Sequence, residues 1–281
     1  MKVVTRVNEV QQEVIKQKKV HRSVGFIPTM GALHAGHLAL LRRAKGQSDF
    51  VVVSIFVNPK QFNDKDDLKR YPRPLEKDLA KLEDAGCDMV FTPTEKEIYP
   101  RDFDLDYPLG YLDQIMEGKH RRGHFRGVVT VVHRLLDIVQ PDKAFFGEKD
   151  YQQLTIIKKM VKDLHLPCTI IPCPIVRDPD GMAMSSRNAL LSPEQRNHAP
   201  LIYKTLKDAL HLKDTHTIEQ VKKWVADTIN NDPELKLEYF EIVDSTDLKA
   251  VSSWHENNHI IACIAAWAGK IRLIDNLKFS S

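Results

Sequence analysis

The chain has 281 residues, of which 42% are hydrophobic, and a formal net charge of +3 at pH 7. This is enough to bury a substantial core, and it predicts one large domain and one smaller one. A net charge of +3 across 41 basic and 38 acidic residues gives no basis for a nucleic-acid surface. No apolar run is long enough to span a membrane and no apolar signal region begins the chain, so we expect a cytoplasmic protein.

Apolar runs alternate with helical patterns through the first 176 residues. The expected strands cover residues 24–27, 50–56, 88–91, 143–146 and 169–176, the expected helices 34–44, 74–85 and 152–164, and a further apolar run 128–139. This alternation predicts an α/β fold, a Rossmann-like parallel sheet with helices on both faces. Ligands would then collect at the carboxyl ends of the strands.

The segment after the first expected strand contains an H-x-G-H pattern, from His34 to His37. If a helix begins near His34, the spacing of three residues places both imidazoles on one side of its first turn, beside unpaired backbone N–H groups. Gly36 has no Cβ and would let a nucleotide approach the backbone closely. This pattern indicates a phosphate site; the alternative is two surface histidines at a helix start.

Two distant segments carry further groups that suit phosphates. Residues 147–150 (Gly-Glu-Lys-Asp) follow the strand 143–146 and present Lys149 at a strand-to-helix turn. Residues 184–188 (Met-Ser-Ser-Arg-Asn) follow a turn signal at 178–181 and offer hydroxyl, guanidinium and amide groups. A solvated lysine and an ordinary polar loop are the alternatives.

Beyond residue 176 the pattern changes to a small α+β domain. Ser192 and Thr217 each begin a capping box, which predicts two helix starts. Residues 237–243, 259–266 and 270–273 are expected strands. We therefore expect two domains, residues 1–176 binding nucleotide and substrate and residues 177–281 forming a lid over the active site.

The four cysteines show no C-x-x-C pair and no zinc-ligand spacing with histidine. Cys168 and Cys173 would point to opposite faces of their strand, because their spacing of five positions is odd. We expect buried free thiols.

The segments that carry chemistry resemble a known family. They are residues 28–37, 56–62, 70–73, 123–127, 146–153, 184–188 and 272–276. In this order they resemble the pantoate–β-alanine ligases, in the nucleotidyltransferase superfamily that shares H-x-G-H and K-M-S-K-S-like loops with class I aminoacyl-tRNA synthetases. The likeness runs nearly end to end, and one departure is Lys60, where Met or Thr is expected.

The resemblance implies a two-step, ATP-dependent ligation in coenzyme A precursor biosynthesis. Pantoate attacks the α-phosphorus of ATP to give pantoyl adenylate and pyrophosphate, and β-alanine then displaces AMP to give pantothenate. Fixed cations and N–H donors are the strongest means of stabilising the charge that develops. The resemblance implies catalytic roles for His37, His34 and Lys149. It implies a nucleotide site lined by Met30, Gly31, Ala32, Leu33, His34, Ala35, Gly36, His37, Gly147, Glu148, Lys149, Asp150, Val176, Met184, Ser185, Ser186 and Arg187.

Gln61 and Gln153 are the residues we expect on pantoate, because an amide can donate to a carboxylate and accept from a hydroxyl. Gln61 is also a candidate for orienting β-alanine. Asn58 and Tyr71 are further substrate candidates, although both also suit plain turns. Mg²⁺ should accompany ATP, with Asp150 and Asp78 as candidate ligands. We expect Arg121 and Arg122 to lie in a solvated loop, and the family resemblance implies a homodimer.

Three other functions remain open at this point. An adenylyltransferase would use the same histidines but attack with a phosphate. A tRNA synthetase would need more chain than the 105 or so residues after Val176, as well as a basic face. A nucleotide-sensing binding protein would leave ATP intact.

Overall fold

A computed structural model describes residues 1–101, 103–256 and 259–279. The chain divides into two compact units. The first unit contains Met1–Glu148 and Gln152–Pro174, and the second contains Lys149–Tyr151 and Ile175–Ser281.

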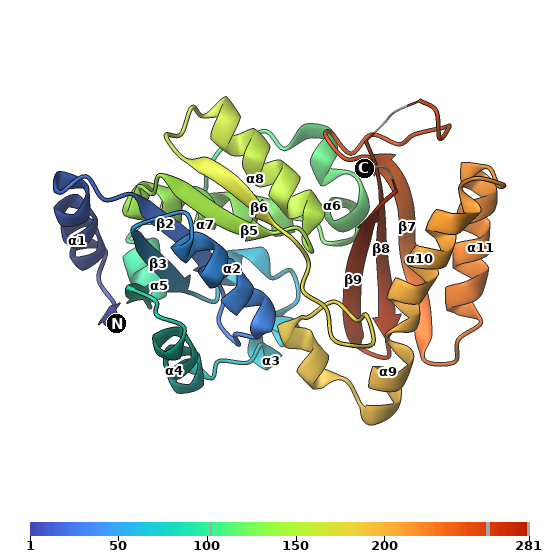
Figure 1. Cartoon of the computed structure of the whole chain (residues 1–281), viewed down its shortest axis with the longest axis horizontal. Coiled ribbons are helices and arrows are strands. Elements are labelled where there is room, and N and C mark those ends of the chain that lie inside the picture. Colours follow the sequence, from blue (N-terminus) through green and yellow to red (C-terminus); the bar gives the residue numbers. More distant parts are fainter. Residues whose placement is uncertain (102, 257–258, 280–281) are drawn as a thin grey trace. The chain divides into compact units, whose positions relative to one another are not determined.

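The first unit is built on a six-stranded sheet in the order β1-β4-β3-β2-β5-β6, in which all pairs are parallel (Figure 1). Its strands are β1 (Lys2–Val4), β2 (Val24–Thr29), β3 (Phe50–Ile55), β4 (Met89–Phe91), β5 (Lys143–Gly147) and β6 (Thr169–Cys173). Helices lie on both faces, so the predicted Rossmann-like fold is confirmed. The chain proceeds from β2 to β3 and β4 on one side and places β5 and β6 on the other. The strand order therefore reverses between β2 and β5, where such sheets bind ligands.

The continuous apolar run predicted for β3 is explained by burial on both faces of the sheet. Val51 and Val52 are 0% exposed and Val53 is 1% exposed. Residues such as these form the core of a parallel sheet, since helices shield both sides from water. Burying side chains of this size stabilises the fold by about 1.5–3 kcal/mol each.

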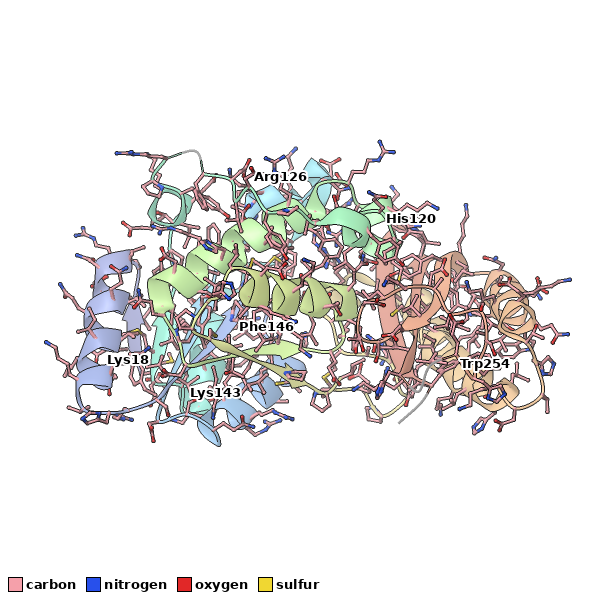
Figure 2. The ribbon with its side chains drawn as sticks, turned by 90° about the horizontal axis from the view of Figure 1, so that it is seen from above. Lys18, His120, Arg126, Lys143, Phe146 and Trp254 are labelled. Carbon is pink, nitrogen blue, oxygen red and sulfur yellow. The ribbon has the colours of Figure 1, made fainter. Side chains whose placement is uncertain are left out.

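The helices of the first unit are more numerous than the periodicity predicted. They are α1 (Val7–Lys19), α2 (Ala35–Lys45), α3 (Lys65–Arg70), α4 (Leu75–Asp84), α5 (Glu95–Ile98), α6 (Met116–His120), α7 (His124–Val139) and α8 (Tyr151–Asp163), with 3₁₀ turns η1 (Pro59–Gln61) and η2 (Gly110–Asp113). The apolar run 128–139 is the inner part of α7, most of which is buried. Arg126 lies on the exposed side of the same helix, whereas Phe146 of β5 is 6% exposed (Figure 2).

Strand β6 ends at Cys173, three residues earlier than predicted. Pro174 follows it and has no N–H to donate to a sheet ladder, so pairing stops there. Strand β1 was not predicted, because a three-residue strand gives almost no periodic signal. Helix α1 was not predicted either.

The second unit is an α+β fold, as predicted. Its helices are α9 (Pro193–His198), α10 (Leu201–Leu212) and α11 (Ile218–Asn230), with the turn η3 (Ser186–Leu190). Its strands β7 (Leu235–Asp244), β8 (Ile260–Ala268) and β9 (Ile271–Lys278) form an antiparallel sheet in that order. Ser192 and Thr217 both form the predicted capping boxes, which confirms the two helix starts.

All four cysteines are free, and Cys87, Cys173 and Cys263 are buried. Burial raises the pKa of Cys87 to about 12 and that of Cys173 to about 11. These thiols stay protonated at neutral pH. The predicted free thiols are confirmed, but Cys168 is only half-buried, so the predicted burial holds for the other three. Within the described ranges, no helix combines the length and apolar character needed to cross a membrane.

Gly127 of α7 lies directly against η1, and this contact predicts a stability defect. A Cβ at Gly127 would lie 2.2 Å from the carbonyl oxygen of Lys60 and 2.6 Å from the backbone nitrogen of Gln61. Because backbone atoms cannot move aside locally, we expect Gly127→Ala to lower the free energy of unfolding by about 1–3 kcal/mol in urea denaturation. Gly46→Ala is the matched control, since its nearest atoms would be 3.6 Å away. Equal stabilities for the two variants would contradict this packing.

Candidate functional site

Two imidazoles lie beside each other at the N-terminus of α2. His34 is the N-cap residue, and its Nδ1 accepts a hydrogen bond from the Gly36 N–H at 3.2 Å. The Nδ1 of His37 accepts from the His34 N–H at 3.3 Å, and the two ring centroids are 4.1 Å apart. The predicted placement of both rings on one side of the first turn is confirmed.

These hydrogen bonds determine which ring nitrogen carries the proton. Since Nδ1 is the acceptor in both rings, each neutral ring carries its proton on Nε2. The Nε2–H groups of His34 and His37 are therefore donors at a helix end where the dipole and backbone N–H groups favour anions. This arrangement suits binding of phosphoryl oxygens.

The turn that leads into α2 has an unfavourable backbone. Gly31 has φ of +84° and Ala32 has φ of +52°. The left-handed conformation costs a residue with a Cβ roughly 1–2 kcal/mol. The carboxylate of Asp78, on α4, offsets this cost by accepting from the Ala32 N–H at 2.7 Å and the Leu33 N–H at 2.8 Å.

Asp78 thus has a different role from the magnesium role that the sequence suggested. Its side chain is 0% exposed, and its two oxygens accept from backbone N–H groups. The carboxylate holds the turn that carries the two histidines.

The turn η1, after β3, is held against α7 by a buried asparagine. Asn58 is 1% exposed, and its Nδ2 donates to the Gly127 carbonyl at 3.1 Å. Its Oδ1 accepts from the hydroxyl of Tyr99 at 3.0 Å. Burial raises the pKa of Tyr99, which keeps that hydroxyl protonated as a donor.

Gln61 ends η1 and connects it to the β2–α2 turn, which leads to the histidine pair. Its Nε2 donates to the sulfur of Met30 at 3.0 Å, and its Oε1 accepts from Asn58 at 3.2 Å. The structure therefore brings Met30 of the β2–α2 turn next to one of the residues expected on pantoate. Lys60 points elsewhere: its ammonium bonds Asp104 at 2.9 Å.

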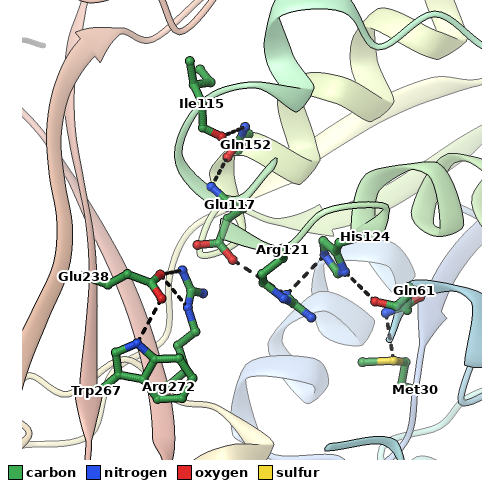
Figure 3. A network of polar contacts seen from close by, with 10 residues as sticks. All are labelled: Met30, Gln61, Ile115, Glu117, Arg121, His124, Gln152, Glu238, Trp267 and Arg272. Atoms are coloured by element: carbon green, nitrogen blue, oxygen red, sulfur yellow. Dashed lines mark hydrogen bonds and ion pairs between the residues drawn. The ribbon is translucent and has the colours of Figure 1, made fainter. Parts of the chain in front are cut away.

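A chain of polar contacts runs from α6 to Gln61 (Figure 3). Glu117 and Arg121 form an ion pair at 3.7 Å, and an Arg121 nitrogen lies 3.3 Å from Nε2 of His124. The Nδ1 of His124 lies 2.7 Å from the backbone carbonyl oxygen of Gln61. Since that oxygen can only accept, His124 carries its proton on Nδ1 and accepts from Arg121 at Nε2.

This network corrects one expectation. Arg122 is exposed as expected, but the Arg121 side chain is only 19% exposed and is ion-paired. The expectation that Arg121 lies in a solvated loop was wrong, because its partners come from α6 and the start of α7.

Two segments of the second unit carry the side chains that we expect to bind phosphate. They are the segment around Lys149 and residues 184–188. Lys149 is half-buried, at the turn between β5 and α8. Ser185 caps η3 by accepting from the Arg187 N–H at 3.2 Å, so the expected loop is a short 3₁₀ turn. Ser186 and Arg187 are half-buried in that turn.

The remaining candidates lie in varied surroundings. Gln153 on α8 and Val176 are half-buried, and Asp150 is exposed. Tyr71 is 6% exposed and packs edge-on against Phe62, with ring centroids 5.8 Å apart.

Sequence reasoning missed two buried polar residues in the first unit. His124 is 6% exposed and Gln152 is 4% exposed. Gln152 donates to the Leu112 and Ile115 carbonyls at 2.7 and 3.1 Å and accepts from the Glu117 N–H at 2.9 Å. Both occupy buried positions of amphipathic helices, and a polar residue at such a position was the available signal.

Comparison with known proteins decides the family. A model of the pantoate-beta-alanine ligase family matches residues 2–278. The chain belongs to the pantoate–β-alanine ligase family. It is therefore a ligase, and the adenylyltransferase, tRNA synthetase and binding-protein alternatives are set aside.

Individual relatives agree over the full length. A pantothenate synthetase from Porphyromonas gingivalis is 46% identical over 279 residues, covering 99% of both chains. The structure of a Thermus thermophilus pantothenate synthetase is similar, with a TM-score of 0.93, 40% identity and 100% coverage of both chains. A Francisella tularensis pantoate-beta-alanine ligase, complexed with "Beta-gamma ATP" and β-alanine, has a TM-score of 0.83 and 37% identity, with 99% and 98% of the two chains covered.

The buried carboxylate under the β2–α2 turn predicts a stability effect. In Asp78→Asn, an NH₂ group replaces one acceptor and faces a backbone N–H, so one buried donor loses its partner. We expect the free energy of unfolding to fall by about 1–3 kcal/mol in urea denaturation. Asp84→Asn, at an exposed position of the same helix, is the control and should change it by less than about 0.5 kcal/mol. A stability of Asp78→Asn equal to that of the control would show that the carboxylate does not hold the turn.

Proposed function

We propose that the chain condenses pantoate with β-alanine to form pantothenate, using ATP and passing through pantoyl adenylate. Pyrophosphate leaves in the first step and AMP in the second, in a reaction that supplies coenzyme A biosynthesis. The observation that carries this proposal is the pair of Nδ1-accepting histidines at the N-terminus of α2, beside the point where the strand order reverses. Membership of the ligase family supports the choice of substrates.

The difficulty in the first step is charge. A carboxylate oxygen of pantoate forms a bond to the α-phosphorus as the bond to the pyrophosphate oxygen breaks, so negative charge grows on phosphoryl oxygens. Donors that are already in position stabilise this charge without reorganisation. We assign His34 and His37 to the phosphoryl oxygens through Nε2–H, with His37 as the main donor.

Lys149, Ser185, Ser186 and Arg187 would bind the phosphates. The remaining nucleotide contacts would come from the β2–α2 turn, the β5–α8 turn and the segment before η3. Those residues are Met30, Gly31, Ala32, Leu33, Ala35, Gly36, Gly147, Glu148, Asp150, Val176 and Met184.

Pantoate would be bound by Gln61 and Gln153, with Asn58 and Tyr71 nearby in sequence as further candidates. Gln61 is 9% exposed and its amide is held by Met30 and Asn58, so the amide is oriented before substrate arrives. In the second step the β-alanine amine attacks the acyl carbon and AMP leaves with the former carboxylate oxygen. Gln61 would orient that amine.

Mg²⁺ would accompany ATP and neutralise part of the phosphate charge. Among the described residues, no three His, Cys, Asp or Glu side chains cluster as a metal site. An Mg²⁺ ion that accompanies ATP is commonly held mainly by phosphates and water and needs few protein ligands. Asp150, exposed after β5, is the carboxylate we propose for it.

We also retain three proposals about organisation: residues 1–176 bind nucleotide and pantoate, residues 177–281 act as a lid domain, and the protein works as a cytoplasmic homodimer.

The direct test of the function is AMP release with ATP and Mg²⁺, omitting pantoate and β-alanine in turn. We expect AMP only when both are present, and pantoate-dependent exchange of pyrophosphate into ATP without β-alanine. AMP release that does not depend on pantoate would contradict the proposal.

His37→Ala should slow adenylation while the protein stays folded. Removing one positioned donor typically costs about 10²–10³-fold in rate. The measurement is single-turnover formation of pantoyl adenylate, with circular dichroism to check the fold. An unchanged rate would remove His37 from the mechanism.

His124 should act on pantoate through Gln61, whose carbonyl it binds at 2.7 Å. His124→Leu removes the donor, whereas in His124→Asn the amide nitrogen can take the place of Nδ1. We expect the leucine variant to raise KM for pantoate about tenfold, with KM for ATP unchanged and the asparagine variant close to wild type. A fall in kcat alone, equal in both variants, would mean that His124 only stabilises the fold.

A further inference from the structure

The segment 272–276 on β9 belongs to the family pattern, but no role has been given to it so far. Two of its side chains, Asp275 and Asn276, are each 5% exposed. Burying a carboxylate and an amide is costly unless they are hydrogen-bonded. Their partners therefore indicate what the segment does.

The Asn276 side chain holds the main chain of Lys149. Its Nδ2 donates to the Lys149 carbonyl oxygen at 2.9 Å. Two residues further on, the hydroxyl of Tyr151 donates to the Ser245 carbonyl at 2.9 Å. Lys149–Tyr151 belong to the second unit. The segment that carries the lysine is thus fastened at both ends within that unit.

Asp275 holds a small hairpin, residues 176–184, that leads into Ser185; Arg177 and Ala183 form an antiparallel bridge across it. Two nitrogens of Arg177 donate to its carboxylate at 2.6 and 2.9 Å. The same guanidinium donates to the Gly181 carbonyl at 3.1 Å and lies 3.6 Å from the Tyr203 ring centroid. The hairpin closes through the Met184 N–H and the Val176 carbonyl at 3.0 Å, directly before Ser185.

Strand β9 is itself fixed to β7 at its other end. Arg272 donates from Nε to the Glu238 carboxylate at 2.9 Å, and Trp267 Nε1 donates to the same group at 2.9 Å (Figure 3). A strand held in this way is a rigid reference for the segments attached to it.

We infer that Asn276 and Asp275 are a positioning pair, in which Asn276 places the backbone of Lys149 and Asp275 places the hairpin before Ser185. The inference rests on the proposed function, because the phosphate-binding roles of Lys149 and residues 185–187 are part of it. Successive residues of a strand point to opposite faces, which lets one strand hold two segments.

The chemistry of the pair supports a positioning role over a purely stabilising one. A buried ion pair such as Arg177–Asp275 is often no more stabilising than apolar residues of similar size, because both charges lose water. A fixed backbone, by contrast, matters directly for a lysine, whose side chain has many rotamers. A displacement of about 1 Å at a reacting centre can cost about 10²-fold in rate.

A double-mutant cycle tests the Asn276 arm. Asn276→Leu removes the donor with little change in volume, and Lys149→Met removes the ammonium. We expect Asn276→Leu to lower kcat/KM for ATP by about 10- to 100-fold when Lys149 is present. In the Lys149→Met background the same change should cost less than about twofold, because its target is gone.

Lys213→Met is the matched control, since it also removes one side-chain bond to a backbone carbonyl in the second unit, that of Phe279 at 3.0 Å. It should change kcat/KM by less than about twofold in both backgrounds. If Asn276→Leu does not fold, Asn276→Ser goes through the same cycle. An equal loss in both backgrounds would overturn the inference and leave Asn276 a stabilising residue.

The Asp275 arm is tested in the same way with Asp275→Asn and Arg187→Met. We expect the loss caused by Asp275→Asn to shrink when Arg187 is absent and to persist in the Lys149→Met background. If Asp275→Asn lowers kcat/KM by the same factor in both backgrounds, the positioning role of Asp275 is overturned. A wild-type chain that forms no pantothenate, or a fully active Lys149→Met, would contradict the proposed function itself, whereas additive cycles in an active enzyme contradict only the positioning pair.

Discussion

A single buried carboxylate determines the path of the chain where β2 leads into α2. Asp78 accepts from two successive backbone N–H groups, in a turn where Gly31 and Ala32 both have positive φ. Without these bonds the left-handed Ala32 would have no compensation for its strain. The positions of His34 and His37 follow from this turn, because His34 caps the helix that the turn begins.

The surroundings of Gln61 show the same design in a second place. Asn58, which precedes η1, donates to the Gly127 carbonyl, and His124 binds the backbone carbonyl of Gln61 at the end of η1. Gly127 allows α7 to approach this turn closely. Side chains on turns are ordinarily mobile, but here hydrogen bonds fix η1 to helix α7 and fix the Gln61 side chain to Met30 of the β2–α2 turn. Preorganised donors of this kind are what a reaction between a carboxylate and a polyphosphate requires, since the donors need not reorient as charge develops.

Much of the fold could be predicted from local pattern. The doubly buried strands are continuous apolar runs, and Ser192 and Thr217 carry their capping partners three residues away. The histidine geometry was equally accessible, because it depends on spacing within one helical turn. The short strand β1 was beyond reach, since it exists only through pairing with β4, more than eighty residues away.

The residues that hold the site in place could not be predicted, for the same reason. Asp78 lies 46 residues from Ala32, and His124 lies 63 residues from Gln61. Nothing in the spacing of either residue distinguishes a buried partner from a solvated one. The sequence accordingly suggested a metal for Asp78 and solvent for Arg121, whereas the fold gives both of them partners within the protein.

The central claim is that the carboxylate of pantoate becomes bonded to the α-phosphorus of ATP before any amide forms. The most direct measurement uses pantoate labelled with oxygen-18 in its carboxylate, followed by mass spectrometry of the AMP released in the presence of β-alanine. The account predicts one labelled oxygen in the phosphoryl group of each AMP. Unlabelled AMP alongside labelled pantothenate would contradict it.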